Sequence, residues 1–205
     1  MDSFSIKNLI DKTQLDYLKK YISSIEPTLS KDENDRQTYS GGPVLYSLLN
    51  YLLPTARKYF KNENIIPSFA CTSIYNGSKS LLKPHMDTMA CTYGIDLCVS
   101  QTRPWEIYVN DKSYLLEEGE AIFYYGEDMV HWRDKVLSDD DKVCNAFIFY
   151  VDPDHWYHKT ALEDHESIQD KISKKNDQYA EIIKDSPDGI FTSKMLNLLK
   201  TKNTI

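Results

Sequence analysis

A block of short strand-like segments between residues 66 and 151 is the feature that most constrains the fold. Six runs rich in β-branched and aromatic residues alternate with turn-forming residues, as is typical of a sheet sandwich or barrel. The runs are SFACTSIYN, GIDLCVSQ, WEIYVN, SYLLE, EAIFYYG and VCNAFIFYV. NDK at 110–112 predicts a tight hairpin, and EEGE at 117–120 predicts another turn. The chain is therefore expected to build a layered or closed β core.

Helical patterns flank this block on both sides. Apolar residues recur at helical intervals in SIKNLIDKTQLDYLKKYISSI, and a second helix is predicted for PVLYSLLNYLLPTARKYF. Pro43 suits a first helical position, whereas Pro54 predicts a kink or a break, and the polar KDENDRQTYSGG (31–42) predicts a loop. We therefore expect an α+β fold in a single domain over 1–205. It comprises a helical region (1–60), a β core (about 66–151) and a helical tail (152–205).

Composition narrows the functional classes. A hydrophobic content of 41% and 15 tyrosines indicate a packed core, and a net charge of −7 makes nucleic acid a poor default partner. No segment approaches the roughly 18 consecutive apolar residues of a membrane span, and MDSFSIKNLIDKTQ lacks the pattern of a secretory signal. The four cysteines show no CxxC spacing, so we expect reduced, buried thiols and a cytoplasmic location.

His85 and Asp87 stand in KPHMDT at the head of a predicted strand. A strand points residues i and i+2 to the same face, so an imidazole and a carboxylate would converge there. Such a short motif is weak evidence by itself. However, His131 follows 43 intervening residues (88–130), between a predicted strand and the last long strand. Two imidazoles and one carboxylate form a facial iron site that leaves positions open for a co-substrate and oxygen.

At this point the chain resembles a known family. The motif HMD, the later GEDMVHWRD and a strand ending FIFYVD are similar to the Fe(II)/2-oxoglutarate-dependent dioxygenases, prolyl-4-hydroxylase-like branch. Further pieces that match this branch are YSGGPVLYSLL, PSFACTSIYNGS, PWEIYV and LEEGEAIFYYG. The resemblance spans about residues 39–153 and leaves the first 38 residues and the tail after Asp154 uncovered. It implies a double-stranded β-helix, a jelly-roll or cupin-like barrel, with flanking N- and C-terminal helices.

The resemblance also implies a ligand set. Fe(II) would be held by His85, Asp87 and His131, and the co-substrate 2-oxoglutarate would need a cation for its far carboxylate. Arg133 in HWR is preferred over Lys142, although the family commonly places this cation near Lys142, one residue closer to the second histidine. Tyr75 is the expected hydrogen-bond donor to the co-substrate. Weaker candidates are Lys83 and Arg103 for the cation and Tyr93 for the tyrosine.

The expected function is therefore an Fe(II)- and 2-oxoglutarate-dependent oxygenase that consumes O2, releases succinate and CO2, and has ascorbate as a reductant. Hydroxylation of an amino acid, free or peptidyl, is preferred, and desaturation and demethylation stay open. The loop 76–84 and the N-terminal loops would form a lid. Alternatives are a non-catalytic binding barrel or a 2-oxoglutarate-independent cupin-type metal dioxygenase. Asp154, His155 and His158 match no closed zinc pattern.

Overall fold

The computed structural model describes residues 2–32, 34–88, 90–133 and 137–155, in which ten strands and three helical segments follow one another. The elements in chain order are β1 (Phe4–Ile6), α1 (Lys12–Ile25), the 3₁₀ helix η1 (Glu26–Thr28), β2 (Arg36–Ser40), α2 (Pro43–Phe60), β3 (Ile66–Asn76), β4 (Leu82–His85), β5 (Tyr93–Gln101), β6 (Ile107–Val109), β7 (Lys112–Tyr114), β8 (Ala121–Tyr124), β9 (His131–Arg133) and β10 (Lys142–Val151).

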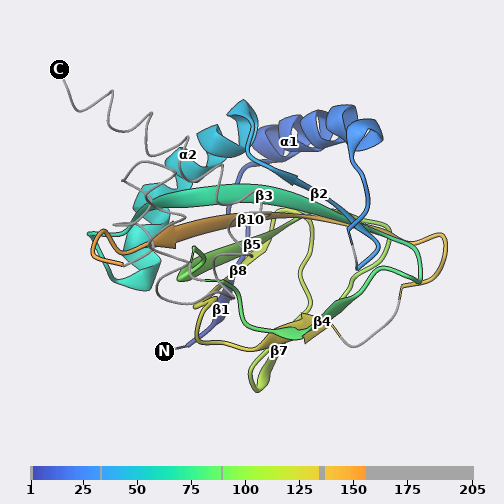
Figure 1. The fold of residues 1–205 in the computed structure, drawn as a ribbon. Helices are drawn as coiled ribbons and strands as arrows, with labels where there is room; N and C mark the ends of the chain where they lie inside the picture. The colour runs from blue at the N-terminus through green and yellow to red at the C-terminus, as the bar shows by residue number, and fades with distance from the viewer. Residues whose placement is uncertain (1, 33, 89, 134–136, 156–205) are drawn as a thin grey trace, which may run out of the picture.

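The strands form two antiparallel sheets that face each other (Figure 1). The larger sheet has the order β1-β8-β5-β10-β3-β2, and the smaller one has the order β4-β9-β6-β7. Neighbours in both sheets come from distant parts of the chain, since the long central strand β10 pairs with β3 on one side and β5 on the other. This arrangement confirms the predicted α+β class and the double-stranded β-helix.

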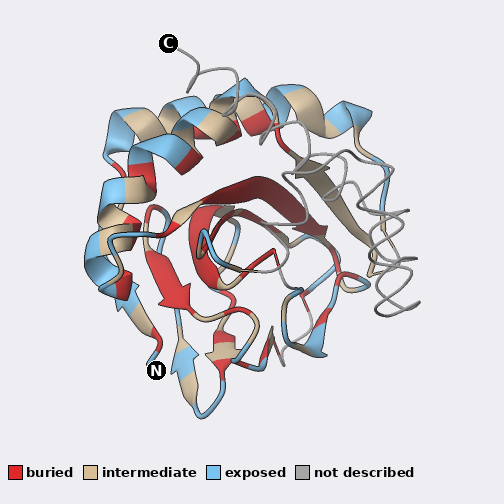
Figure 2. Cartoon of the chain, turned by 60° about the vertical axis from the view of Figure 1, so that its left-hand side comes forward, coloured by how far each residue is buried: buried red, intermediate tan, exposed pale blue. Residues whose placement is uncertain are grey.

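Both helices cover the outer face of the larger sheet (Figures 1 and 2). Asp11 caps α1, because its side chain accepts from the Gln14 backbone N–H while the Gln14 side chain accepts from the Asp11 N–H. Pro43 occupies the first turn of α2, as predicted. The apolar stripes of the two helices pack on the sheet in one buried cluster, which includes Leu18, Ile22, Leu49, Leu52 and Phe60.

Alternation along β10 separates this outer cluster from an inner one. Ala146, Ile148 and Tyr150 point toward the helices, whereas Val143 and Phe149 belong to a second cluster between the sheets. The long strands β3, β5 and β10 of the larger sheet are buried on both faces, so none of their positions is fully exposed. The inner cluster is the part of the core that supports the candidate site.

The six predicted strand runs each overlap an observed strand, although SYLLE shares only Ser113 and Tyr114 with β7, and other predictions need correction. The 31–42 segment is not all loop, because Arg36–Ser40 pairs with β3 as the edge strand β2. Pro54 does not break α2, since the buried Leu52 and Ala56 hold the helix on the sheet on either side of it. The predicted tail helices after residue 155 lie outside the described residues.

In the part of the chain that the structure describes, no helix is both long enough and apolar enough to cross a lipid bilayer.

Candidate metal centre

His85, Asp87 and His131 lie together at one end of the space between the sheets. One ligand atom from each residue lies within 4.8 Å of the other two. Asp87 Oδ1 is 3.6 Å from His85 Nε2 and 3.5 Å from His131 Nε2. Among the described residues, this is the one group of three His, Cys, Asp or Glu side chains with spacing fit for a metal ion.

Strand pairing brings the two histidines together. His85 ends β4 and stands directly opposite His131 on β9, and their ring centroids are 4.2 Å apart. Asp87 follows β4 by two residues, and its backbone N–H donates to the Gly126 carbonyl at 2.8 Å. The His131 side chain is only 5% exposed and that of His85 is 39% exposed, so the site opens on the His85 side.

Backbone carbonyls orient both imidazoles. His85 Nδ1 lies 2.7 Å from the Lys83 carbonyl, and His131 Nδ1 lies 3.0 Å from the Met129 carbonyl. Because a carbonyl only accepts, each Nδ1 carries the proton and donates. Both Nε2 lone pairs are therefore directed to the point that Asp87 Oδ1 also faces. This outer-shell pattern is what metal-binding histidines require.

The carboxylate is fixed by a tyrosine that sequence analysis did not single out. Tyr124 donates from its hydroxyl to Asp87 Oδ2 at 3.1 Å, which leaves Oδ1 toward the imidazoles. Two glycines make room for this pair. A Cβ at Gly94 would lie 2.7 Å from the Tyr124 ring, and a Cβ at Gly126 would lie 2.7 Å from Asp87 Oδ2.

Electrostatics treats the two histidines differently. Burial, with the neighbouring His131, lowers the pKa of His85. Burial also acts to lower the pKa of His131, but hydrogen bonding and charge attraction from Asp87 outweigh it and raise that pKa above its ordinary value. Burial beside the Asp87 charge raises the pKa of Tyr124 well above its usual range, so the phenol stays a hydrogen-bond donor.

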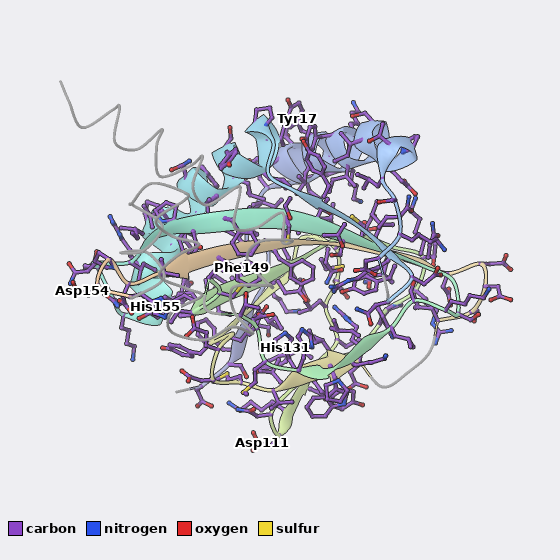
Figure 3. All side chains as sticks on the ribbon, in the orientation of Figure 1. Tyr17, Asp111, His131, Phe149, Asp154 and His155 are labelled. Carbon is purple, nitrogen blue, oxygen red and sulfur yellow. The ribbon has the colours of Figure 1, made fainter. Side chains whose placement is uncertain are left out.

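A cavity of about 260 Å³ lies over the triad. Phe69, Phe147 and Phe149 form an apolar wall, and the triad residues lie across from them. Figure 3 shows Phe149 beneath β10 and His131 on the side of the smaller sheet. A larger hollow of about 400 Å³ lies between α1 and α2, but no triad residue lines it. The chemistry is therefore assigned to the inner cavity.

Arg133 is buried two residues beyond His131 on the same face of β9. Its Nη1 donates to the Trp105 carbonyl, its Nη2 lies 3.4 Å from Asp96 Oδ2, and its guanidinium stacks 4.8 Å from the Trp105 ring. Asn145 donates to the other Asp96 oxygen at 2.6 Å. Arg133 Nε and the Tyr75 hydroxyl, in contrast, have no hydrogen-bond partner among the described residues.

Lys142 lies on the opposite face of the sheet. It shares the orientation of Cys144 and Ala146 toward the helices, and its Nζ is 2.5 Å and 2.6 Å from the two Glu26 carboxylate oxygens. The structure thus favours Arg133 over Lys142 for the co-substrate, and binding by either residue stays a prediction.

The weaker candidates are engaged elsewhere. Tyr93 donates to Asp152 at 2.8 Å, Arg103 pairs with Asp141 at 3.2 Å, and His155 lies 3.4 Å from Glu127. His158 lies outside the described residues, so the structure does not address a second metal site that includes it. Asp154 and His155 are placed apart from His131 in Figure 3.

The loop predicted as a lid is anchored at Ser80. The Ser80 hydroxyl accepts from the Asn76 N–H at 2.8 Å and donates to the Asp35 carbonyl at 2.9 Å, and Ser80 is fully buried. A lid role for this loop stays a prediction.

Comparison of this structure with solved ones finds the same architecture. No protein-family model and no curated protein sequence matches the chain. The chain is similar in structure to the non-heme α-ketoglutarate-dependent carbocyclase SnoK from nogalamycin biosynthesis, with a TM-score of 0.61 at 12% identity over 74% of this chain and 80% of SnoK.

Two prolyl hydroxylases show the same similarity. The collagen prolyl hydroxylase of Paramecium bursaria Chlorella virus-1 gives a TM-score of 0.55 at 10% identity over 72% of this chain and 94% of its own. A Pseudomonas putida prolyl-4-hydroxylase gives 0.55 at 9% identity over 72% and 91%. These likenesses, in agreement with the two-sheet topology, establish that the chain has the double-stranded β-helix fold of the Fe(II)/2-oxoglutarate-dependent oxygenases.

Proposed function

We propose that the protein is an Fe(II)- and 2-oxoglutarate-dependent oxygenase that hydroxylates a C–H bond of an amino acid, free or peptidyl. One observation carries the proposal: two histidine Nε2 atoms and one Asp87 carboxylate oxygen converge at the inner cavity of this fold. Solved structures with the same fold include an epimerase in complex with Fe³⁺ and α-ketoglutarate. The preference for an amino-acid substrate rests on the likeness to prolyl hydroxylases.

The donor set fits a divalent iron ion. Imidazole and carboxylate ligands suit Fe(II), and two of the former with one of the latter leave open positions for other ligands. Both imidazoles are held in the tautomer that presents Nε2, and Asp87 Oδ2 is occupied by Tyr124. The site is thus arranged for binding before any ion arrives.

Two buried polar atoms of residues outside the cavity lining suit a carboxylate of 2-oxoglutarate. The Tyr75 hydroxyl and Arg133 Nε are donors without partners among the described residues, and a buried unpaired donor costs about 1–3 kcal/mol. A carboxylate accepts hydrogen bonds from both kinds of donor. We assign the far carboxylate of 2-oxoglutarate to these two residues.

Bound iron and 2-oxoglutarate would supply the oxidising chemistry, with O2 consumed and succinate and CO2 released. The protein's own residues bind, orient and shield. The triad holds the ion, Tyr124 keeps the Asp87 carboxylate in one orientation, and the phenylalanine wall excludes water from the C–H bond that reacts. Ascorbate as reductant and a cytoplasmic location belong to the proposal, and four buried cysteines that form no disulfide support a reducing compartment.

One observation favours a second candidate, a metal dioxygenase that works without 2-oxoglutarate. Asp96 already faces the Arg133 guanidinium at 3.4 Å, so the buried cation has a carboxylate partner before any co-substrate binds. Removal of 2-oxoglutarate from the assay separates the two candidates.

The test measures succinate formed from 2-oxoglutarate by anaerobically purified protein after addition of Fe(II), ascorbate and oxygen. We expect slow succinate formation without added substrate and none from a His85→Ala/Asp87→Ala variant. The same samples are read for the visible charge-transfer band of iron-bound 2-oxoglutarate. Absence of both signals in folded protein overturns the proposal, and iron binding without the band promotes the second candidate.

A further inference from the structure

Arg36 on β2 places a cation in the wall of the cavity over the triad. Given the function proposed above, we infer that Arg36 binds a carboxylate of the prime substrate. The substrate class is therefore a small molecule or chain end that combines a carboxylate with an apolar body, as opposed to an internal, uncharged peptide segment.

The register of the larger sheet puts Arg36 in the cavity. Arg36 pairs with Tyr75 across the β2–β3 ladder, and Thr38 pairs with Ser73, so these side chains share the inner face. The cavity is lined by Arg36 together with all three triad residues. Arg36 and the triad thus line the same open cavity.

The Arg36 guanidinium is oriented but not saturated. Its Nε donates to Asp32 Oδ2 at 2.5 Å, while Asp32 Oδ1 accepts from the backbone N–H groups of Asn34 and Arg36. A guanidinium has five N–H donors, and of these Nε is taken by Asp32 while the Tyr75 hydroxyl interacts with the guanidinium from the neighbouring strand. Asp32 and Tyr75 therefore hold the group in place, and the remaining N–H donors are left for a carboxylate.

The other cationic side chains considered for the barrel have partners of their own. Arg133 is assigned to 2-oxoglutarate and is buried against Asp96 and the Trp105 carbonyl, and Lys142 lies on the far face of the sheet with Glu26. Arg36 is the one arginine or lysine among the residues that line the cavity in the described part of the chain. Its side chain is 26% exposed, so a ligand reaches it without unfolding of the barrel.

The other residues that line the cavity favour a substrate with an apolar body. Phe69, Phe147 and Phe149 offer an apolar wall, and Phe147 and Phe149 stack with an interplanar angle of 5°. Thr38 and Ser73 add hydroxyls beside Arg36 and hydrogen-bond each other at 3.1 Å. A ligand with its carboxylate on Arg36 and its hydrocarbon on the phenylalanines would satisfy both walls.

Arg36 has one alternative role, which is to bind the far carboxylate of 2-oxoglutarate. Arg36 lies beside Tyr75, the residue assigned to the far carboxylate of 2-oxoglutarate. The Arg36 guanidinium and the Tyr75 hydroxyl interact electrostatically. If Arg36 were the co-substrate anchor, its loss would weaken 2-oxoglutarate and not the substrate carboxylate. The two roles therefore differ in which ligand is lost.

The experiment uses full-length protein, anaerobic and loaded with Fe(II) and 2-oxoglutarate, with loading followed by the charge-transfer band. Loaded and metal-free protein are then titrated with 3-phenylpropanoate and with its neutral amide, 3-phenylpropanamide, by ligand-observed NMR. The variants are Arg36→Gln, Arg36→Lys and the matched control Lys31→Gln, since Lys31 is a neighbouring surface cation paired with Asp35. Thermal unfolding confirms that each variant is folded.

We expect the acid to bind at least about tenfold more tightly than the amide, because a charge-assisted hydrogen bond is worth that much or more. Arg36→Gln should abolish the preference, Arg36→Lys should keep part of it, and Lys31→Gln should keep all of it. The 2-oxoglutarate affinity of Arg36→Gln should stay within about threefold of the parent.

Equal binding of acid and amide, or binding of neither, overturns the inference. So does a loss of 2-oxoglutarate affinity in Arg36→Gln of tenfold or more, which would make Arg36 the co-substrate anchor. A missing charge-transfer band in the parent protein instead contradicts the proposed function. In that case an acid preference on metal-free protein that depends on Arg36 supports the carboxylate site alone.

Discussion

The Tyr124 hydroxyl donates to Asp87 Oδ2 at 3.1 Å, and the other oxygen of that carboxylate faces both imidazoles of the triad. A free carboxylate presents two equivalent oxygens to a metal ion. Here the hydrogen bond distinguishes them, because Oδ2 is taken and Oδ1 is left. Tyr124 is thus a positioning residue, which acts on the ion through Asp87.

Replacement of Tyr124 by phenylalanine should weaken metal binding without loss of the fold. The ring still packs against Gly94, but Asp87 loses the bond that fixes its orientation. We expect affinity for Co(II), used as an air-stable probe, to fall by about 10-fold, at the low end for outer-shell partners. The Co(II) visible spectrum should also change, since carboxylate orientation alters the ligand geometry.

Tyr125→Phe is the matched control for that change. Tyr125 is the next residue, packs against Phe60 and Tyr93, and makes no contact with a triad residue among its ring contacts. It should bind Co(II) as the parent does. Equal affinity in all three proteins would show that Asp87 needs no positioning by Tyr124.

Loss of the ligand itself should have a larger effect. Asp87→Ala removes one of three donors and is expected to reduce Co(II) affinity by more than the about 100-fold upper limit typical of outer-shell changes. Asp128→Asn, which alters an exposed acid three residues before His131, should leave the affinity unchanged. Isothermal titration measures the Co(II) affinity of the two variants and of the parent. An Asp87→Ala affinity comparable to that of the parent would show that Asp87 is not a metal ligand.

The residues that could be predicted from the sequence belong to local patterns, whereas those that were missed depend on contacts with distant parts of the chain. The six strand runs are local patterns that alternation suffices to predict. The H-x-D spacing marked His85 and Asp87, but the predicted strand was wrong there, because His85 ends β4 and Asp87 lies beyond it. Arg36 was predicted as loop because KDENDRQTYSGG is polar, yet pairing with β3 makes that segment a strand. Tyr124 was visible only as a strand residue, since its role depends on Asp87, 37 positions earlier.

Short strands were concealed for a related reason. β1, β4 and β9 have three or four residues each and stand outside the longer runs of strand-forming residues, whereas the equally short β6, β7 and β8 overlap such runs. The orientation of Lys142 was also hidden, because alternation along β10 and the Glu26 carboxylate on η1 decide it together. Only the three-dimensional register of a strand fixes the face on which its cation lies.

The Asp96–Arg133 pair should be far more important for stability than the Glu26–Lys142 pair. Both members of the first pair are at most 3% exposed in their side chains, whereas Lys142 is 39% exposed. Asp96→Ala leaves a buried guanidinium without its carboxylate, and we expect it to reduce the free energy of unfolding by about 3–5 kcal/mol.

Lys142→Ala should cost at most about 1 kcal/mol, as solvent-exposed ion pairs do. Urea denaturation of both variants provides the comparison. Similar losses in the two proteins would mean that burial does not set the value of these pairs.

Metal affinity should depend on pH through His131 before His85. Burial lowers the His131 pKa, but Asp87 more than compensates and raises it above its ordinary value, so the metal-free protein keeps that proton to a higher pH than an ordinary histidine does. A metal ion must displace it, because only the neutral imidazole is a ligand. Burial and His131 lower the His85 pKa, so His85 loses its proton at a lower pH than His131 does.

Because the proton and the metal ion compete for His131, metal affinity should fall as the pH falls. Affinity should be constant above the raised pKa of His131 and should fall about tenfold per pH unit below it, with one proton released per ion bound. Only at lower pH, below the depressed pKa of His85, should the slope steepen toward two protons. Mn(II) affinity, followed from pH 8 to pH 5 by the EPR signal of the free ion, measures this slope. In Asp87→Asn the carboxylate that raises the His131 pKa is gone, so the onset of the decline should move to lower pH. An onset that stays in place would mean that Asp87 does not control the proton on His131.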